Sequence, residues 1–432
     1  MRLLITNSRE EQSYLILQSL RHEAERIVVT VDEGNLFRRW FNTAAWSRHV
    51  SKRYTAPDCT GDWRTGRIEP DNTPAEERYI RRIEEICERE AIDVIFPSYD
   101  AEVFVFSKNR ERLARGGALA VVPDYQALTR VLDKSLTLEA ARKVGFPVPA
   151  TRVPKGLEEL RRAAEEIPGP WVLKPRCNAH GVNILMVDHL EELEQAFTSL
   201  NEIQPRPMVQ EYVPARTKRN YYLVVGPDGE IASLLSPRVD RYRRVGVESH
   251  CAAVESTREV PCEAEVRALV RELGVWGALT LQTIVDERDG VPKLMEINPR
   301  FGHNTWYQTE LGINAPLVAL RLARGQEPGP IPAVPEGYLM LDPLWDLLHL
   351  LGQSLDQSAN WLRGRLSGGS SAAAGPYRPD AVPDMLRAFR SEYFGHRKRI
   401  TNPLNRGLLS DPLPALVRTV RTLLKAVMRR VS

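Results

Sequence analysis

Short apolar runs separated by amphipathic segments fill the first 125 residues. Three runs have the length of buried strands, and two longer segments repeat apolar residues at helical spacing: 3–6, 27–31 and 92–96, then 12–22 and 75–90. Strands that alternate with helices usually pair in parallel. The pattern therefore predicts a small parallel α/β domain over residues 1–125. No GxGxxG follows the first strand, so a dinucleotide site is not indicated.

From residue 126 onwards the pattern changes to strands joined by short turns. Helices are expected to begin near 131–134 and to cover 260–273 and 311–323. The expected strands are 171–175, 183–187, 208–213, 221–225, 231–235, 278–286 and 291–298. Asp289-Gly290 between the last two apolar runs is a strong hairpin signal. The segment is therefore expected to be an α+β domain with hairpins.

The last hairpin carries the candidate chemistry. Side chains alternate faces along a strand, so Glu296 and Asn298 share one face. Folding the hairpin back brings Gln282 to about the level of Glu296. Carboxylate and amide oxygens are the hard ligands that suit Mg²⁺ bound with substrate phosphates. The alternative is an edge hairpin whose polar face meets water.

The strand ends at Pro299, and Arg300 follows at its mouth. Proline cannot extend a central ladder, which explains the end of the strand. A planar guanidinium at that point can clamp phosphate oxygens.

Composition bounds the class of protein. The chain has 432 residues, enough for two to three domains, and 43% hydrophobic with 27% charged residues is ordinary for a soluble globular protein. A net charge of +3 indicates no general binding of polyanions such as nucleic acid. Five cysteines without a CxxC pair indicate neither a disulfide framework nor a zinc site. A reducing, cytoplasmic location is expected, since the N-terminus lacks a signal-peptide pattern and no window approaches a membrane span.

The run Glu296-Ile-Asn-Pro-Arg300 after a hairpin resembles the metal-binding signature of the ATP-grasp superfamily. Gln282, Glu296 and Asn298 together are similar to the metal set of carbamoyl-phosphate-synthase-type members. The resemblance spans roughly residues 1–330. It implies ATP and Mg²⁺ or Mn²⁺ as cofactors, these three residues as metal ligands, and Arg300 in catalysis. It also implies a two-subdomain ATP-grasp fold over 126–330, after an α/β domain over 1–125.

Further ATP contacts follow from the same resemblance. A helix carrying Lys134, a proline-rich entry and a strand carrying Lys174 occur in the family's order, which implies that both lysines contact ATP phosphates. Gly181 lies in a loop similar to the family's phosphate-covering loop, and the backbone at Glu211 and Val213 would read the adenine. A lysine buried in an apolar strand also needs a partner on physical grounds. The family's acidic ribose contact has no counterpart in residues 214–220.

The sequence leaves two possible roles open for each of two charged segments. Asp100 and Glu102 follow the strand at 92–96, where ligands of open α/β sheets bind. They could touch a substrate, or they could be the acids of a helix's first turn. Residues 238–244 hold four arginines, which could form a solvated basic loop or an anion-binding segment.

The C-terminal region, 331–432, is expected to be helical, with a Ser/Gly/Ala-rich linker at 367–376. In a helix over 413–431, Leu416 and Val420 fall on an apolar face and Arg418 and Arg421 largely on a basic one. Such a helix can lie on an anionic membrane or dock on its own chain or a partner.

These observations predict an ATP-dependent ligase. By resemblance, ATP would convert a carboxylate into an acyl-phosphate, and an amine would attack it to form a carbon–nitrogen bond. The substrates would be small molecules, and a homo-oligomer is compatible with the sequence. The alternative is a non-catalytic ATP- or ADP-binding scaffold or regulatory protein of a biosynthetic complex.

Overall fold

The computed structural model describes most of the chain up to residue 342 and three shorter stretches beyond it. The described ranges are 1–34, 39–59, 61–66, 68–178, 183–215, 217–245, 248–302, 305–342, 390, 399–401 and 411–431. The predicted linker at 367–376 and the loop glycine Gly181 lie outside these ranges.

The N-terminal strands form the predicted parallel sheet, in the order β3-β2-β1-β4-β5. The strands are β1 (Arg2–Ile5), β2 (Arg26–Asp32), β3 (Lys52–Ala56), β4 (Val94–Phe96) and β5 (Leu119–Ala120). Apolar side chains of β1, β2 and β4 are almost completely buried, as expected when helices cover both faces. The accompanying helices are α1 (Glu11–Leu20), α3 (Pro74–Glu90), α4 (Asp100–Lys108) and α5 (Arg110–Arg115), with short 3-10 turns η1 (Ala44–Trp46) and η2 (Asp62–Thr65).

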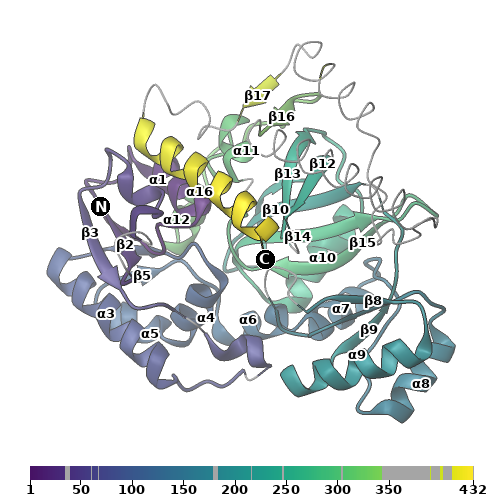
Figure 1. The fold of residues 1–432 in the computed structure, drawn as a ribbon. Helices are drawn as coiled ribbons and strands as arrows, with labels where there is room; N and C mark the ends of the chain where they lie inside the picture. Colours follow the sequence, from purple (N-terminus) through teal and green to yellow (C-terminus); the bar gives the residue numbers. More distant parts are fainter. Residues whose placement is uncertain are drawn as a thin grey trace.

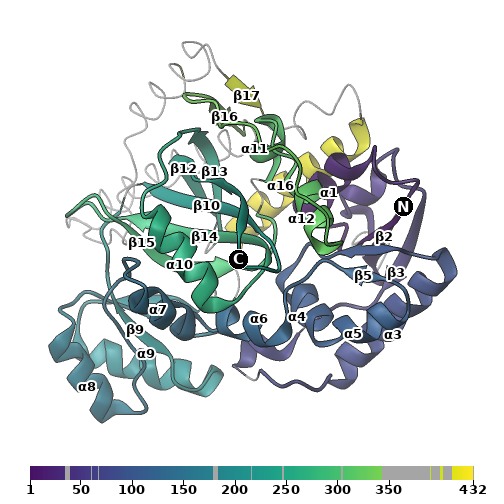
Figure 2. The same cartoon turned by 180° about the vertical axis from the view of Figure 1, so that it is seen from behind.

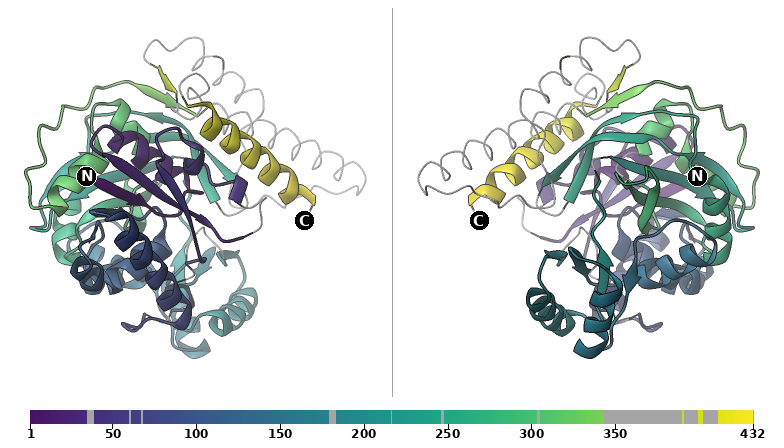
Figure 3. Two further views of the ribbon diagram at one scale, coloured as in Figure 1. Left: turned by 90° about the vertical axis from the view of Figure 1, so that its left-hand side faces the viewer. Right: turned by 90° about the vertical axis from the view of Figure 1, so that its right-hand side faces the viewer.

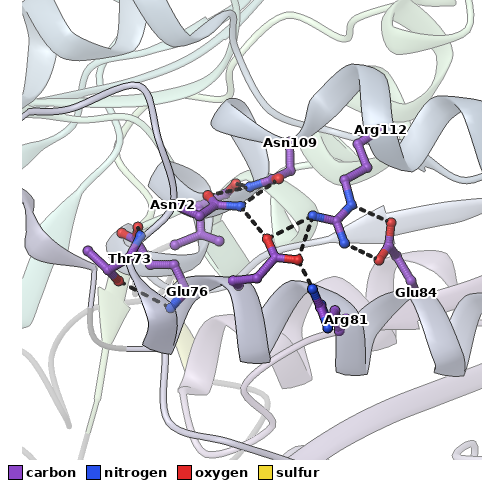
Figure 4. Close-up of polar contacts among 9 residues, drawn as sticks. Asn72, Thr73, Glu76, Arg81, Glu84, Asn109 and Arg112 are labelled. Carbon is purple, nitrogen blue, oxygen red and sulfur yellow. Dashed lines mark hydrogen bonds and ion pairs between the residues drawn. The ribbon is translucent and has the colours of Figure 1, made fainter.

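Helix α3 begins with a complete capping box. The Thr73 hydroxyl accepts from the Glu76 N–H, and the Glu76 carboxylate accepts from the Thr73 N–H. Figure 4 shows how Arg112 of α5 reaches this helix and faces Glu84. Arg112 also donates to Glu77, and this contact, with others from Arg81 and Asn72, lowers the Glu77 pKa to about 2. The network ties α3 to α5 at the surface of the domain.

A small antiparallel sheet follows, in the order β6-β9-β7-β8. Its strands are β6 (Thr151–Arg152), β7 (Trp171–Lys174), β8 (Leu185–Val187) and β9 (Met208–Glu211). Helices α8 (Leu157–Glu166) and α9 (Leu190–Ile203) bury Leu160 and Phe197 against it. The unit stands out as a separate lobe in Figure 1.

A second, larger sheet runs in the order β15-β14-β10-β12-β13-β16-β17, with β11 on β10. Its strands are β10 (Lys218–Val225), β11 (Ile231–Leu235), β12 (Arg238–Val245), β13 (Glu248–Glu255), β14 (Gly277–Val285), β15 (Pro292–Asn298), β16 (Leu339–Leu341) and β17 (Arg399–Thr401). Figure 2 shows α6 (Tyr125–Leu132), α7 (Lys134–Lys143) and α10 (Glu263–Leu273) near this sheet. Leu269 of α10 shares a core with Leu281 and Ile297 of the sheet.

Two features of this sheet depart from the sequence prediction. The arginine-rich segment 238–244 is a strand paired with β13, and therefore not a loop. The region expected to be helical beyond 331 also supplies β16 and β17, which pair with β13 and with each other. Both departures depend on pairing partners that a local pattern does not reveal.

The N-terminal sheet and the large sheet share one core. The intervening helices are α11 (Thr305–Glu310) and α12 (Ala315–Ala323), where the sequence had indicated a single helix over 311–323. Val318 of α12 packs with Ile5 and Phe96 from the parallel sheet and with Val224 of β10. The two sheets are therefore held in a fixed relation by buried apolar contacts.

The C-terminal helix α16 (Pro412–Val431) lies along the N-terminal domain, as Figures 1 and 3 show from three sides. Its buried side includes a residue that the sequence pattern placed on the basic face. Arg418 is 1% exposed and Leu416 is 47% exposed. The Arg418 Nε donates to Glu11 at 2.9 Å, and the same guanidinium pairs with Asp342. The helix therefore docks on its own chain through a buried cation.

None of the helices that the structure describes combines the length and the apolar character needed to cross a membrane.

Candidate functional site

The β14–β15 hairpin places the predicted metal ligands together. Gln282 pairs directly with Glu296, and Thr280 pairs with Asn298. The sequence placed Gln282 only at about the level of Glu296, and the structure now gives the register. A bulge at Met295 follows the Gln282–Glu296 pair, a device often found beside active sites.

The opposite face of the hairpin is apolar. Leu281 is fully buried and Ile297 is 5% exposed, both within the core under α10. Because neighbours along a strand alternate, Gln282, Glu296 and Asn298 all lie on the other face. In the described part of the chain, the Gln282 and Asn298 side chains have no protein hydrogen-bond partner. Their amide oxygens are free for a ligand.

This donor set fits Mg²⁺ or Mn²⁺ held jointly with nucleotide phosphates. It offers one carboxylate and two amide oxygens, all hard donors. No group of three or more His, Cys, Asp or Glu side chains with metal-ligand geometry occurs among the described residues. The protein alone therefore provides an incomplete shell, which suits a metal that completes its octahedron with phosphate and water oxygens.

Lys134 comes to the same place from helix α7. It is the first residue of the helix, after the N-cap Asp133, and it is 5% exposed. Its Nζ lies 3.4 Å from the Glu296 carboxylate and donates to the Asn178 side chain at 2.6 Å. The helix start therefore delivers a cation to the edge of the predicted metal set.

Lys174 ends strand β7 and points its ammonium into the protein. It is 3% exposed, and Nζ donates to the Gln210 side-chain oxygen at 2.9 Å. Burial and the nearby charge of Lys134 lower its pKa to about 8, while Glu296 acts in the opposite direction. A buried ammonium whose acceptor is a neutral amide is under-compensated. The two lysines and Glu296 thus form one electrostatic unit that would favour an added anion.

Glu211 and Val213 lie at the end of β9. The Glu211 carboxylate accepts from the Ala150 N–H at 3.0 Å and from Arg288 at 3.1 Å, so its side chain ties the small sheet to the hairpin turn. The Val213 N–H has no acceptor in the described part of the chain, and Val213 is 6% exposed. The backbone here keeps the free donor that reading an adenine edge requires.

Arg300 directly follows β15 and meets a residue from the other domain. Its Nε donates to Asp100 at 2.9 Å, and Nη1 donates to the Phe301 carbonyl at 3.2 Å. Asp100 is the first residue of α4, so it is a first-turn acid that also holds the arginine. Sequence reasoning missed this contact, because the partners are 200 positions apart and nothing local links them.

Glu102 lies deeper in the N-terminal domain. It accepts from the Tyr79 hydroxyl at 2.6 Å and from the Ser98 N–H at 3.3 Å. Burial raises its pKa to about 7, although the Tyr79 hydrogen bond acts in the opposite direction. Glu102 is 2% exposed and is therefore an internal residue of this domain rather than a surface contact.

Sequence comparisons agree with this geometry. Residues 131–303 match a family model described as an ATP-grasp domain. A D-alanine–D-alanine ligase of Delftia acidovorans is 24% identical over 41% of this chain and 57% of its own length. The large-chain N-terminal section of a carbamoyl phosphate synthase from Methanopyrus kandleri is 22% identical over 42% of this chain and 33% of its own. An alanine–anticapsin ligase of Bacillus subtilis is 27% identical over 31% of this chain and 27% of its own length.

The matches thus span at most a little over half the length of these three curated relatives. Among solved structures, a biotin carboxylase of Campylobacter jejuni has a TM-score of 0.63 at 16% identity, covering 78% of this chain and 74% of its own. The biotin carboxylase domain of a Hydrogenobacter thermophilus 2-oxoglutarate carboxylase, solved with MgADP and bicarbonate, has a TM-score of 0.59 at 16% identity, covering 78% and 73%. At this identity the likeness establishes the shared fold. Residues 131–303 are therefore identified as an ATP-grasp domain, within a chain that shares its fold with these biotin carboxylases.

Proposed function

We propose that this protein is an ATP-dependent carboxylate–amine ligase. One observation carries the proposal: the buried Lys174 and Lys134 converge with Glu296 at the polar face of the β14–β15 hairpin. In phosphoryl transfer the protein contributes mainly the positioning of the reactants and positive charge around the γ-phosphate. A site with two desolvated ammonium groups and an incomplete metal shell supplies that charge.

In this proposal, Lys134 and Lys174 bind the phosphates, and Gly181 belongs to the loop that covers them. The backbone at Glu211 and Val213 binds the adenine edge. Gln282, Glu296 and Asn298 would hold Mg²⁺ or Mn²⁺, which when bound supplies Lewis-acid stabilisation of phosphate charge.

The reaction would proceed in two steps. A carboxylate oxygen of the first substrate attacks the γ-phosphorus, the bond to the β-phosphate oxygen breaks, and ADP leaves. The nitrogen of an amine then attacks the acyl carbon, phosphate leaves with the bonding pair, and the amine loses a proton. Arg300 would bind the transferred phosphoryl group, where a guanidinium stabilises charge that develops in the transition state.

The names of the relatives support this class of reaction. Two of them are named as ligases, a D-alanine–D-alanine ligase and an alanine–anticapsin ligase, and the third is named as a carbamoyl phosphate synthase. Small-molecule carboxylate and amine substrates are therefore proposed here. A location in the cytoplasm is also proposed, since four cysteines are free thiols: Cys59, Cys87, Cys177 and Cys262.

A non-catalytic nucleotide-binding scaffold is the second candidate. It is favoured by the lack of an acid in residues 214–220, where the family usually places its ribose contact. Such a protein would bind ATP without turning it over.

The experiment is phosphate release from ATP and Mg²⁺, measured over a panel of carboxylic acids and amines, with Lys174→Ala as the inactive reference. Release that requires both an acid and an amine supports the ligase. ATP-analogue binding without release over the whole panel supports the scaffold. No binding and no release would contradict both candidates.

A further inference from the structure

Asp100 and Arg300 form a buried contact between the two domains. Their side chains are 4% and 13% exposed, and the Nε–H of Arg300 donates to Asp100 Oδ1 at 2.9 Å. Burial of this kind desolvates both groups, so separating them would leave an uncompensated charge. The contact is therefore strong enough to set the direction of the guanidinium.

The contacts of the Arg300 guanidinium leave part of it available. A guanidinium offers five N–H donors in a rigid plane. Asp100 occupies the Nε edge, and the Phe301 carbonyl accepts from Nη1. Among described residues, none accepts from Nη2. The plane is thus fixed at one edge while the Nη2 end remains available for an anion.

Asp100 is itself held at a defined point of the parallel sheet. The chain leaves β1 in one direction and β4 in the other, so the crevice between these two strands is the sheet's switch point. The Ser98 hydroxyl, just after β4, donates to the Thr6 carbonyl, just after β1, at 2.7 Å. This bond joins the two loops two residues before Asp100. The anchor for the arginine is therefore the first residue of α4, two residues beyond a loop that is hydrogen-bonded to the end of β1.

We propose that Asp100 is a positioning residue: the N-terminal domain uses it to aim Arg300 at the phosphoryl group handled by the ATP-grasp domain. The inference rests on the proposed function of Arg300. It gives the parallel domain a defined part in the chemistry, although Asp100 touches no substrate itself. A purely structural ion pair would hold the domains together and leave turnover unchanged.

The test compares Asp100→Ala, Asp100→Asn, Arg300→Ala and the Asp100→Ala/Arg300→Ala double variant. Each is measured for kcat and KM in the phosphate-release assay and for the Kd of a Mg²⁺-bound non-hydrolysable ATP analogue. Asp100→Ala should lower kcat about 30-fold, within the range known for loss of one oriented charge-stabilising group. Asp100→Asn keeps an acceptor for Nε–H and should recover part of that loss. The double variant should be no worse than Arg300→Ala alone.

Glu76→Gln is the matched control. Glu76 forms an ion pair with Lys108 at 3.0 Å in the same domain, and this pair is even more buried than Asp100–Arg300. Glu76→Gln should lower the Tm but leave kcat unchanged. Additive losses in the double variant, or an unchanged kcat in Asp100→Ala, would overturn the positioning role.

The binding measurement keeps the outcomes separate. If the wild-type protein releases no phosphate with any substrate pair, the ligase proposal fails, and the ATP-analogue Kd then decides on Asp100. Equal weakening of that Kd in Asp100→Ala and Arg300→Ala, with no further loss in the double variant, would still support positioning. Weakening by Arg300→Ala alone, or by neither variant, would refute it.

Discussion

Buried charges are handled differently in the N-terminal layer and on the polar face of the large sheet. In the N-terminal layer two buried cations have carboxylate partners: Lys108 pairs with Glu76, and Arg418 pairs with Glu11 and Asp342. Glu102 is the exception there, since its side-chain partner is the neutral Tyr79 hydroxyl. On the ATP-grasp face, Lys174 meets a neutral amide, and Gln282 and Asn298 lack side-chain partners among the described residues.

The difference separates stability from binding. A matched buried charge contributes to the fold only as long as its partner is present. A buried charge without a matching countercharge costs folding free energy, and a ligand that brings the countercharge recovers it. Substitutions at the matched pairs of Lys108 and Arg418 should therefore change stability and spare nucleotide binding, and substitutions on the ATP-grasp face should do the reverse.

The largest effect is expected at Arg418. Arg418→Met leaves Glu11 and Asp342 buried without their shared cation, which should lower the free energy of unfolding by about 3–5 kcal/mol. Urea denaturation measures it, and the Kd for an ATP analogue should not change. Leu416→Gln, on the exposed side of the same helix, is the control and should have almost no effect. Comparable losses in both variants would mean that α16 does not dock as described.

Glu296→Gln should reverse that pattern. Removal of the single carboxylate from the predicted metal set should lower transition-state stabilisation by about 2–4 kcal/mol. The Tm should stay the same, because Glu296 is partly exposed and forms its ion pair with Lys134 at a distance of 3.4 Å. Mg²⁺-dependent phosphate release gives the measurement, with the exposed Glu263→Gln as control. Wild-type turnover of Glu296→Gln at saturating Mg²⁺ would remove Glu296 from the site.

Glu102 tests the N-terminal layer through pH. Its pKa, about 7, lies above the ordinary value of 4.5, so the unfolded state loses its proton first as pH rises. Stability should fall between pH 4.5 and 7. Glu102→Gln keeps an acceptor for Tyr79 and should be more stable than wild type by about 1–3 kcal/mol at pH 8. The gain should vanish below pH 4.5. A gain of the same size at both pH values would contradict this cause.

The smallest expected effect is the uptake of a fraction of a proton by Lys174 when nucleotide binds. Its pKa is lowered to about 8, so near pH 8 the free protein has lost part of this charge. Bound phosphates favour the ammonium, and ATP-analogue binding at pH 8 should take up about half a proton. Calorimetry in two buffers of different ionisation enthalpy measures the uptake. Lys174→Arg should bind without it, since arginine stays charged. Equal uptake in both proteins would place the titrating group elsewhere.

Local patterns predicted what local physics determines. The strand at 171–174 and the hairpin of residues 221–235 follow from apolar runs and turn residues. The period of two placed Glu296 and Asn298 on one face, but the register that pairs Gln282 with Glu296 came from the structure. The converging Lys174 and Lys134 were expected only through the family's order of elements. What the sequence could not give is set by distant partners.

Arg418 is the clearest such case. Helical periodicity places it on a polar face, but acids 407 and 76 positions away make that face the buried one. Asp100 likewise has the sequence of an ordinary first-turn acid, and its role depends on an arginine from another domain. Residues 238–244 form a strand although their four arginines suggested a loop, because they hydrogen-bond to β13, a partner that the local sequence does not reveal.

The most direct test is calorimetric titration of wild type and Lys174→Ala with a non-hydrolysable ATP analogue and Mg²⁺, alongside the Tm of each protein. Loss of a buried charged donor to phosphate should raise the Kd at least about tenfold, in line with 1.5–3 kcal/mol for such a bond. The Tm should stay equal or rise, because the substitution removes an under-compensated charge. An unchanged Kd with a lowered Tm would make Lys174 a structural residue and contradict the assignment of this face to ATP.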